Sequence, residues 1–217
     1  MSSSHFVPSD LPDYMTWEEL ERLPEEIAGQ IQLWEGRVVW EWRGPAEHQD
    51  CACVLFTSLR RCAREDMHTR RDHNWRISTG LNVFLGDTGK SNFVTPDFLV
   101  YRCPENEYQD IRATDVYLAG DVLSPSNTER DIEAKKARYA GAGIPWYWEV
   151  LLGRAPRRIT IVRAYALETG PGRLPTGVAP LRPANYVVAG EWASATTDGI
   201  DFDFPFPIRI PWSELEF

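Results

Sequence analysis

Two aspartates and a lysine in one short stretch of the chain have the residue types that metal-assisted hydrolysis of a phosphodiester requires. Asp97 precedes one apolar run, Asp121 lies within another, and Lys135 follows in a segment with helical character, directly before Lys136. Two carboxylates can hold a divalent cation, and a nearby ammonium can orient or activate a water. We therefore take Asp97 and Asp121 as candidate metal ligands and Lys135 as a candidate catalytic residue.

Each of these three residues also has a simpler structural interpretation. A carboxylate within an apolar strand is costly to bury without a partner, so we favour a metal-ligand role for Asp97 over that of a strand-end residue in water. Asp121 follows the same reasoning, although the glycine before it also fits a simple turn. Lys135 lies four residues after Asp131, and such a pair is equally typical of a solvent-exposed helix. The pattern favours a metal site and leaves the role of the lysine open.

The elements that position these residues follow from apolar periodicity and from glycine and proline breaks. Capping signals and repeats of three or four residues predict helices at 16–21, 45–65 and 129–142. Apolar runs predict a hairpin at 30–42 and strands at 75–85, 93–101, 115–123, 146–151 and 158–167. A turn is expected at 124–128, a surface loop at 170–183 and short strands at 186–217. This order predicts an α+β or α/β fold with a mixed β-sheet flanked by helices and extra C-terminal β elements.

The length and composition bound the class of protein. With 217 residues, of which 43% are apolar, we expect one domain over 16–217 after a flexible N-terminus at 1–15. We expect no membrane span and no secretory signal, because no apolar stretch is long enough and the N-terminus has no basic start. The four cysteines form no CxxC pair and no zinc-type spacing, which favours a reduced, cytoplasmic protein.

The formal net charge of −9 counts against a protein that coats itself in nucleic acid, because phosphate contacts need Lys and Arg. It does not exclude a nuclease with an acidic metal site and a local basic groove. One candidate patch is arginine-rich and interrupted by three acids; it comprises Arg60, Arg61, Arg64, Arg70, Arg71 and Arg76 beside Glu65, Asp66 and Asp72. We favour a solvated helix end and loop for this segment over a nucleic-acid rim.

The ordered series of motifs resembles the PD-(D/E)XK nuclease superfamily and, within it, the bacterial Uma-two family of restriction-type endonucleases. The resemblance covers roughly residues 16–150. It also includes the hairpin around Glu35-Gly36 and His48. It rests mainly on Pro96-Asp97, Asp121-Val122-Leu123-Ser124-Pro125-Ser126, Asp131, Lys135, Tyr139 and Gly143-Ile144-Pro145-Trp146-Tyr147-Trp148.

The resemblance implies a central mixed sheet flanked by helices, with Asp97 and the acid at 121 binding Mg²⁺ or Mn²⁺. In the wider superfamily the lysine lies two residues after the second acid, where this chain has Leu123. In this family it has moved to the following helix, which points to Lys135, although helical geometry does not separate Lys135 from Lys136. The resemblance further implies DNA as the substrate and a homodimer, since two sites suit the cutting of two strands.

The chain departs from the family pattern at three positions. The family usually has glutamate where this chain has Asp121, whose carboxylate reaches one methylene less far. Glutamates are common where this chain has Gln32 and Arg37, and Glu35 replaces such an acid only if the hairpin register differs. Glu35 and His48 are therefore secondary candidates, each with a plain structural interpretation as a turn residue and a helix-start residue.

Three hypotheses follow from these residues. The first is a cytoplasmic, metal-dependent DNA endonuclease. The second is a catalytically inactive descendant in which the same fold serves as a binding or interaction module, and the third is an unrelated hydrolase of a small substrate. Convergence of Asp97, Asp121 and Lys135 favours catalysis, whereas carboxylates that point apart or a solvent-exposed lysine favour the binding module.

Overall fold

The computed structural model describes residues 11–41, 44–86, 88–103, 106, 109–123, 127–153, 157–169 and 184–217. The helices are α1 (Trp17–Leu20), α2 (Glu25–Ala28), α3 (Ala46–Thr69), α4 (Glu129–Gly141) and the 3₁₀ turns Ala113–Asp115 and Trp212–Leu215. The first strands are β1 (Ile31–Trp34), β2 (Arg37–Trp40), β3 (Trp75–Ser78), β4 (Val83–Phe84), β5 (Phe93–Val94) and β6 (Phe98–Arg102). The later strands are β7 (Val116–Leu123), β8 (Trp146–Leu152), β9 (Ile159–Thr169), β10 (Ala184–Ala193), β11 (Gly199–Phe202) and β12 (Ile208–Pro211).

A six-stranded mixed sheet forms the centre of the molecule, with the strand order β10-β9-β8-β7-β6-β3. Within it, β7 and β8 are parallel and the other neighbouring pairs are antiparallel. A parallel pair needs a crossover connection, and α4 supplies it between β7 and β8. The chain order therefore forces α4 to lie directly over the strands that it connects.

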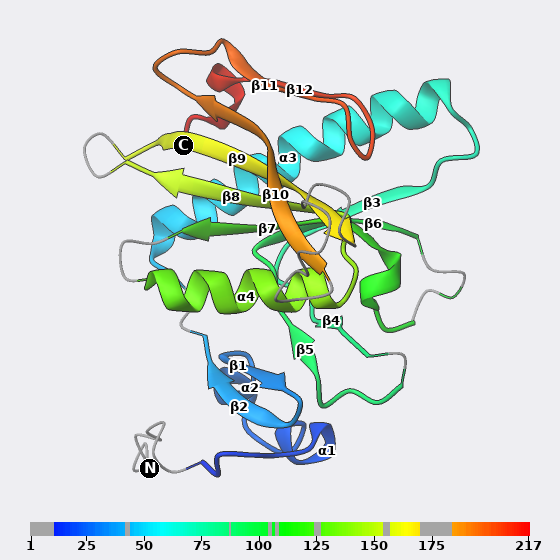
Figure 1. The fold of residues 1–217 in the computed structure, drawn as a ribbon, viewed down its shortest axis with the longest axis vertical. Coiled ribbons are helices and arrows are strands. Elements are labelled where there is room, and N and C mark those ends of the chain that lie inside the picture. The colour runs from blue at the N-terminus through cyan, green and yellow to red at the C-terminus, as the bar shows by residue number, and fades with distance from the viewer. Residues whose placement is uncertain are drawn as a thin grey trace, which may run out of the picture.

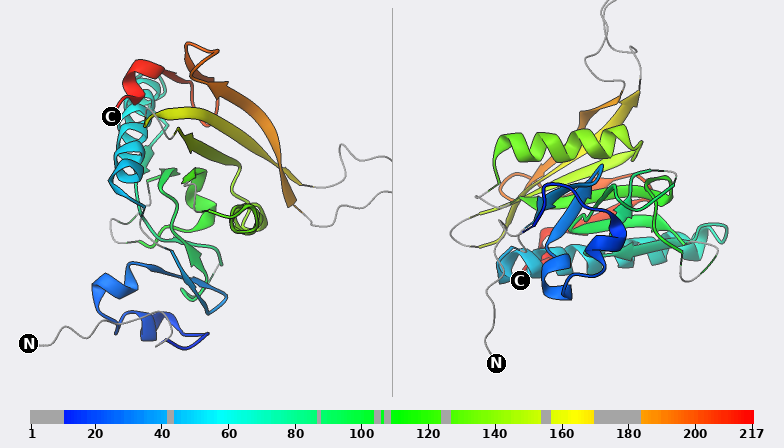
Figure 2. Two further views of the ribbon diagram at one scale, coloured as in Figure 1. Left: turned by 90° about the vertical axis from the view of Figure 1, so that its left-hand side faces the viewer. Right: turned by 90° about the horizontal axis from the view of Figure 1, so that it is seen from below.

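The two long helices cover opposite faces of this sheet, as the edge-on view shows (Figures 1 and 2). On the α3 face the core is built from apolar residues that alternate along the strands, such as Phe98, Val122 and Trp148. On the α4 face, Leu99 and Tyr147 pack with Tyr139 of the helix. Successive side chains of a strand point to opposite faces, so Asp121 is directed toward α4 because Val122 is directed toward α3.

The N-terminal segment forms a smaller layer at one end of the sheet (Figure 1). Thr16 and Glu19 form the expected capping box of α1. The β1–β2 hairpin turns through Glu35 and Gly36, both at positive φ (55° and 83°), as a two-residue hairpin turn demands. Within residues 11–15, which the sequence assigns to a flexible N-terminus, Met15 is buried and donates its backbone N–H to the carbonyl of Gly36.

The mixed sheet flanked by helices and the C-terminal β elements confirm the predicted fold class. Two predicted strands are divided, however. Segment 93–101 separates into β5 and β6 because Pro96 has no N–H for a ladder, so Asp97 lies just before β6 rather than within a strand. Segment 75–85 separates into β3 and β4 around Gly80, which has a φ of 61°.

Helix α3 continues to Thr69, four residues beyond the predicted end, and β10 is a ten-residue strand rather than a short piece. The predicted turn residues 124–126, the loop 170–183 and Trp42 at the end of the hairpin lie outside the described residues. Within the described part of the chain, none of the helices combines the length and the apolar character that crossing a membrane requires.

Candidate active site

Asp97 and Asp121 lie opposite each other on neighbouring segments at one end of the sheet. Phe98 pairs with Gly120 in the antiparallel β6–β7 ladder, so the next position brings Asp97 beside Asp121 on the same face. The backbone N–H of Val122 donates to Asp97 Oδ2 at 2.7 Å, which fixes this carboxylate against the strand that carries Asp121. Asp121 is buried, with 6% of its side chain exposed, whereas 23% of the Asp97 side chain is exposed.

Helix α4 brings Lys135 to these carboxylates. Thr128 caps the helix by accepting a hydrogen bond from the backbone N–H of Asp131 at 3.2 Å. Lys135 Nζ lies 2.8 Å from Asp121 Oδ1 and 2.6 Å from Glu41 Oε1. The lysine is therefore buried between two carboxylates and does not point into solvent.

His48 approaches the same cluster from the first turn of α3. Its Nε2 lies 2.8 Å from Asp97 Oδ1, and the side chain is buried. Burial lowers the pKa of His48, but the hydrogen bond and the charge of Asp97 outweigh burial and raise the pKa above its ordinary value. His48 therefore orients Asp97 and carries part of its compensating charge.

Burial controls the electrostatics of the cluster. It raises the pKa of Asp121 to about 6 from 3.8, even though the Lys135 ammonium opposes the shift. Burial also lowers the pKa of Lys135, but Asp121, Glu41 and Asp97 outweigh it and hold the pKa well above its ordinary value. Tyr139, which donates a hydrogen bond to Asp121 Oδ1 at 3.4 Å, also has a raised pKa because it is buried beside these acids. At neutral pH the lysine is thus a fixed cation and Tyr139 a neutral donor.

The donor set fits a hard divalent cation. Asp121 Oδ2 is buried and has no hydrogen-bond partner among the described residues. Three carboxylates, those of Glu41, Asp97 and Asp121, face one ammonium and one histidine, so the cluster keeps excess negative charge that a cation would neutralise. Among the described residues, no group of three or more His, Cys, Asp or Glu side chains is arranged so that it could hold a metal ion. Mg²⁺ commonly takes one or two carboxylates and completes its shell with water, so Asp97 and Asp121 suffice.

A second charged cluster lies beside the first and has a different character. Glu149 of β8 is in register with Asp121 of β7, so both carboxylates lie on the α4 face. Lys136 Nζ lies 2.7 Å from Glu149 Oε1, and the hydroxyl of Tyr165 donates to Glu149 Oε2 at 2.7 Å. Arg163 Nη1 is 3.6 Å from the same Oε2 atom. This cluster is compensated by protein groups and is buried under α4.

The structure brings together Asp97, Asp121, Lys135 and His48 and separates them from the other two sequence candidates. Lys136 turns to Glu149, which resolves the ambiguity between the adjacent lysines in favour of Lys135 as the neighbour of Asp121. Glu35 occupies the hairpin turn, exposed, with Arg138 at 3.8 Å, and has no place in the cluster among the described contacts. The hairpin register therefore does not let Glu35 replace the missing acids.

Glu41 is the cluster residue that sequence reasoning missed. It directly follows β2, and its backbone N–H donates to the carbonyl of Gln30, so the hairpin extends far enough to hold it beside α4. Gln32, one of the positions where the resemblance leads us to expect glutamate, is buried and accepts a hydrogen bond from Trp34 Nε1 at 3.0 Å. The sequence signal for Glu41 was that it is an acid near the end of the predicted hairpin, shortly before the Gly44-Pro45 break.

Comparisons with family profiles and with solved structures each find proteins that are similar to this chain. The profile of the family Uma2, described as "Putative restriction endonuclease", matches residues 17–170. A crystal structure from Anabaena variabilis, of a protein described as "a putative nuclease belonging to DUF820", is similar with a TM-score of 0.49 and 16% sequence identity over 79% of this chain and 83% of that chain. None of the curated proteins matches the chain. Because the profile spans more than half of the sequence, the protein belongs to the Uma2 family, and the predicted family resemblance is confirmed.

Proposed function

We propose that this protein is a Mg²⁺- or Mn²⁺-dependent endonuclease that hydrolyses phosphodiester bonds in DNA. One observation carries the proposal: Asp121 is buried with an unpartnered oxygen, next to Asp97 and 2.8 Å from Lys135. A buried acid with a raised pKa, a second acid and a fixed ammonium at one end of a sheet are typical of a catalytic centre rather than of a packing contact. Membership of the Uma2 family supports the same reaction class.

Asp97 and Asp121 would hold the metal through oxygen atoms that are hard ligands. When bound, Mg²⁺ supplies Lewis acidity that stabilises negative charge on phosphate oxygens. Asp97 enters this arrangement already oriented, because the N–H of Val122 and the imidazole of His48 each hold one of its oxygens. Such preorganisation reduces the rearrangement that binding requires.

Lys135 acts as a cation rather than as a base. Its pKa is raised by Asp121 and Glu41 despite burial, so it keeps its proton at neutral pH. A protonated ammonium orients an attacking water by donating a hydrogen bond to the water oxygen, and it stabilises charge that develops on the phosphate. The proton of the water must therefore pass to solvent or to a substrate oxygen.

The inactive binding module is the competing proposal, and the buried position of Lys135 argues against it. Only 15% of the lysine side chain is exposed, although a surface helix would leave it in solvent. The homodimer remains a prediction, which light scattering of the purified protein checks directly.

The test is calorimetric titration of Mn²⁺ and Mg²⁺ into the wild type and Asp97→Asn, followed by plasmid nicking with the same samples. Asp72→Asn is the matched control, because Asp72 is exposed and lies beyond the opposite end of α3 from His48. We expect metal binding and nicking in the wild type and the control, and loss of both in Asp97→Asn. Metal binding without nicking would instead support the binding module, and no binding at millimolar metal by the folded wild type would refute the site.

A further inference from the structure

A groove between α3 and β3 carries two arginines that have no ion-pair partner among the described residues. We propose that this groove binds the phosphate backbone of the DNA on one side of the candidate active site, with Arg60 and Arg64 as phosphate ligands. The inference rests on the proposed function, because it states where the substrate of that same site continues. It assigns a role to two of the six arginines in the segment that the sequence alone favoured as a solvated helix end and loop.

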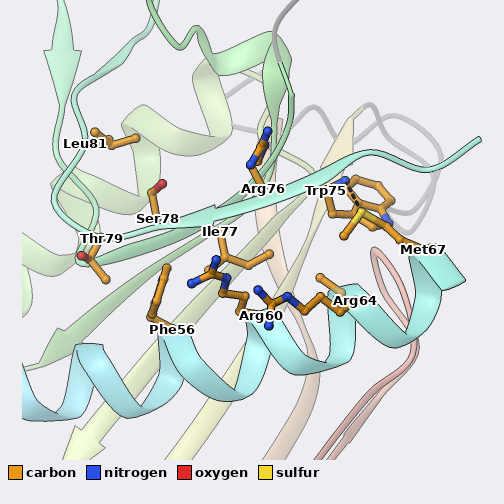
Figure 3. Close-up of a pocket in the computed structure, with 11 residues that line it drawn as sticks. Phe56, Arg60, Arg64, Met67, Trp75, Arg76, Ile77, Ser78, Thr79 and Leu81 are labelled. Carbon is orange, nitrogen blue, oxygen red and sulfur yellow. Dashed lines mark hydrogen bonds between the residues drawn. The ribbon is translucent and has the colours of Figure 1, made fainter. Parts of the chain in front are cut away.

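The groove has a volume of about 430 Å³ and lies where the edge strand β3 passes α3. Figure 3 shows the side chains of Arg60 and Arg64 in the space between the helix and the strand, whereas Arg76 projects from the other side of β3. Phe56 and Ile77 contribute an apolar wall. The two guanidinium groups at this opening suit the phosphates along one strand of a duplex.

The carboxylates nearest in sequence are already engaged elsewhere. Glu65 Oε1 is 3.0 Å from Arg61 Nη1. Asp66 is buried, lies 2.6 Å from His73 Nδ1 and accepts a hydrogen bond from Trp75 Nε1 at 2.9 Å. Glu65 and Asp66 are thus committed to local partners.

Arg60 and Arg64 are exposed and form no ion pair with any residue in the described part of the chain. Arg60 has a ring contact instead, with its guanidinium 5.7 Å from the centre of the Phe56 ring. In a protein of net charge −9, two adjacent cations left without counter-charges form a local positive site for an anion. Phosphodiesters are the anions that the proposed reaction already requires.

The groove lies on the α3 face of the sheet and Asp121 faces α4, so a bound strand would reach the candidate active site around the end of the sheet, where His48 of α3 contacts Asp97. Ser78 pairs with Leu99, two residues after Asp97, so the Ser78 end of β3 lies toward the acidic cluster. Arg60 and Arg64 follow His48 by twelve and sixteen residues on α3, which places them about 18 Å and 24 Å along the helix axis at ~1.5 Å per residue. At ~3.4 Å per nucleotide, a strand parallel to α3 would meet these arginines roughly five to seven nucleotides from the bond held at Asp97.

The experiment measures binding of a fluorescent 30-bp duplex by anisotropy in EDTA and in Ca²⁺, over a series of salt concentrations. The test variant is Arg60→Gln/Arg64→Gln. The control is Arg22→Gln/Arg158→Gln, which removes two exposed arginines outside the groove. The control and the test variant therefore have the same net charge. Asp97→Asn is measured in parallel, and thermal melts confirm that each variant folds.

We expect the groove variant to bind at least about tenfold more weakly near 50 mM salt, with the slope of log K against log salt smaller by about 2. The control should bind like the wild type in both buffers, whereas Asp97→Asn should lose only the part of the binding that depends on Ca²⁺. Three results would refute DNA binding by the groove. These are equal losses of affinity in the groove variant and the control, unchanged affinity in the groove variant, and no binding by the wild type in either buffer. Groove-dependent binding without nicking in Mg²⁺ or Mn²⁺ would support the groove while refuting the nuclease, so the two failures are distinguishable.

Discussion

Asp121 and Glu149 occupy paired positions on the two parallel strands at the centre of the sheet, and two successive lysines of the crossover helix each contact one of them. The parallel pairing sets the two carboxylates side by side on one face. Because Lys135 and Lys136 differ by one position on α4, they reach adjacent strands. Asp121 and Glu149 are both buried acids with one oxygen that lacks a hydrogen-bond partner, but that oxygen of Glu149 has the Lys136 ammonium at 2.7 Å, whereas no ion pair reaches Asp121 Oδ2 among the described residues. The same local design thus yields one structural cluster and one candidate site.

The two lysines should separate stability from activity. Lys135→Ala should reduce nicking by a factor on the order of 10²–10³, because it removes a preorganised cation at the reacting phosphate. Lys136→Ala should destabilise the fold by about 3 kcal/mol, because it removes one compensating charge from buried Glu149. Thermal melts with and without Mn²⁺ distinguish them further: the metal should restore stability to Lys135→Ala, since it replaces the lost charge beside Asp121. Rescue of Lys136→Ala by metal would contradict this division.

Without metal, Asp121 should make stability depend on pH. Its pKa of about 6 in the folded state exceeds 3.8, so the protonated form is favoured by folding and this contribution is lost as the pH rises through about 6. Asp121→Asn removes the buried charge and should be more stable than the wild type at pH 8 in EDTA, by at most roughly 3 kcal/mol. The difference should shrink toward pH 5. Denaturant unfolding at both pH values measures the difference in the free energy of unfolding. If the wild type is more stable than Asp121→Asn at pH 8, the cluster does not carry a destabilising excess of negative charge.

Gly120 should tolerate no side chain, because a Cβ at this position would meet the ring of Phe98. Gly120→Ala therefore forces the β6–β7 pairing or the Phe98 ring to move, next to both candidate ligands, at a cost of roughly 1–3 kcal/mol. Gly141→Ala is the matched control, because it lies in α4 with open space around it and should be neutral or stabilising by up to about 1 kcal/mol. Unfolding midpoints of the two variants, together with Mn²⁺ affinity, provide the comparison. Equal stability of the two would contradict the close packing at Gly120.

The cysteines should differ strongly in reactivity. Cys53 is exposed, whereas Cys51 and Cys62 are buried and Cys103 is intermediate. Burial raises the pKa of the Cys51 and Cys62 thiols, and nearby Asp97 raises that of Cys51 further, so neither forms a reactive thiolate at neutral pH. Ellman's reagent should modify Cys53 first in the native protein, and Cys53→Ser should remove that fast phase. A fast phase that survives this substitution would contradict the expected order, because it would come from Cys103 or from an exposed inner face of α3.

The sequence by itself determined most of the secondary-structure elements and the types of side chain, carboxylate and ammonium, that the candidate site contains. Periodicity and breakers located the capped first helix, the Glu35-Gly36 hairpin, the strand with Asp121 and the helix with Lys135, because these signals are local to each segment. The position of Pro96 also determined the break before β6, although the apolar run around it concealed that break. The motif series was specific enough to place the chain in its family.

The tertiary structure alone decided which residues meet. Lys135 and Lys136 have equal local geometry, and only the placement of α4 over β7 and β8 gives the first to Asp121 and the second to Glu149. Glu41 joins the cluster through the packing of the hairpin against α4, and Glu35 is excluded by the hairpin register. The arginines of α3 divide in the same way, since Arg61 pairs with Glu65 and Glu214 while Arg60 and Arg64 face the groove. Contacts between residues distant in sequence depend on strand order and helix placement, which no local pattern encodes.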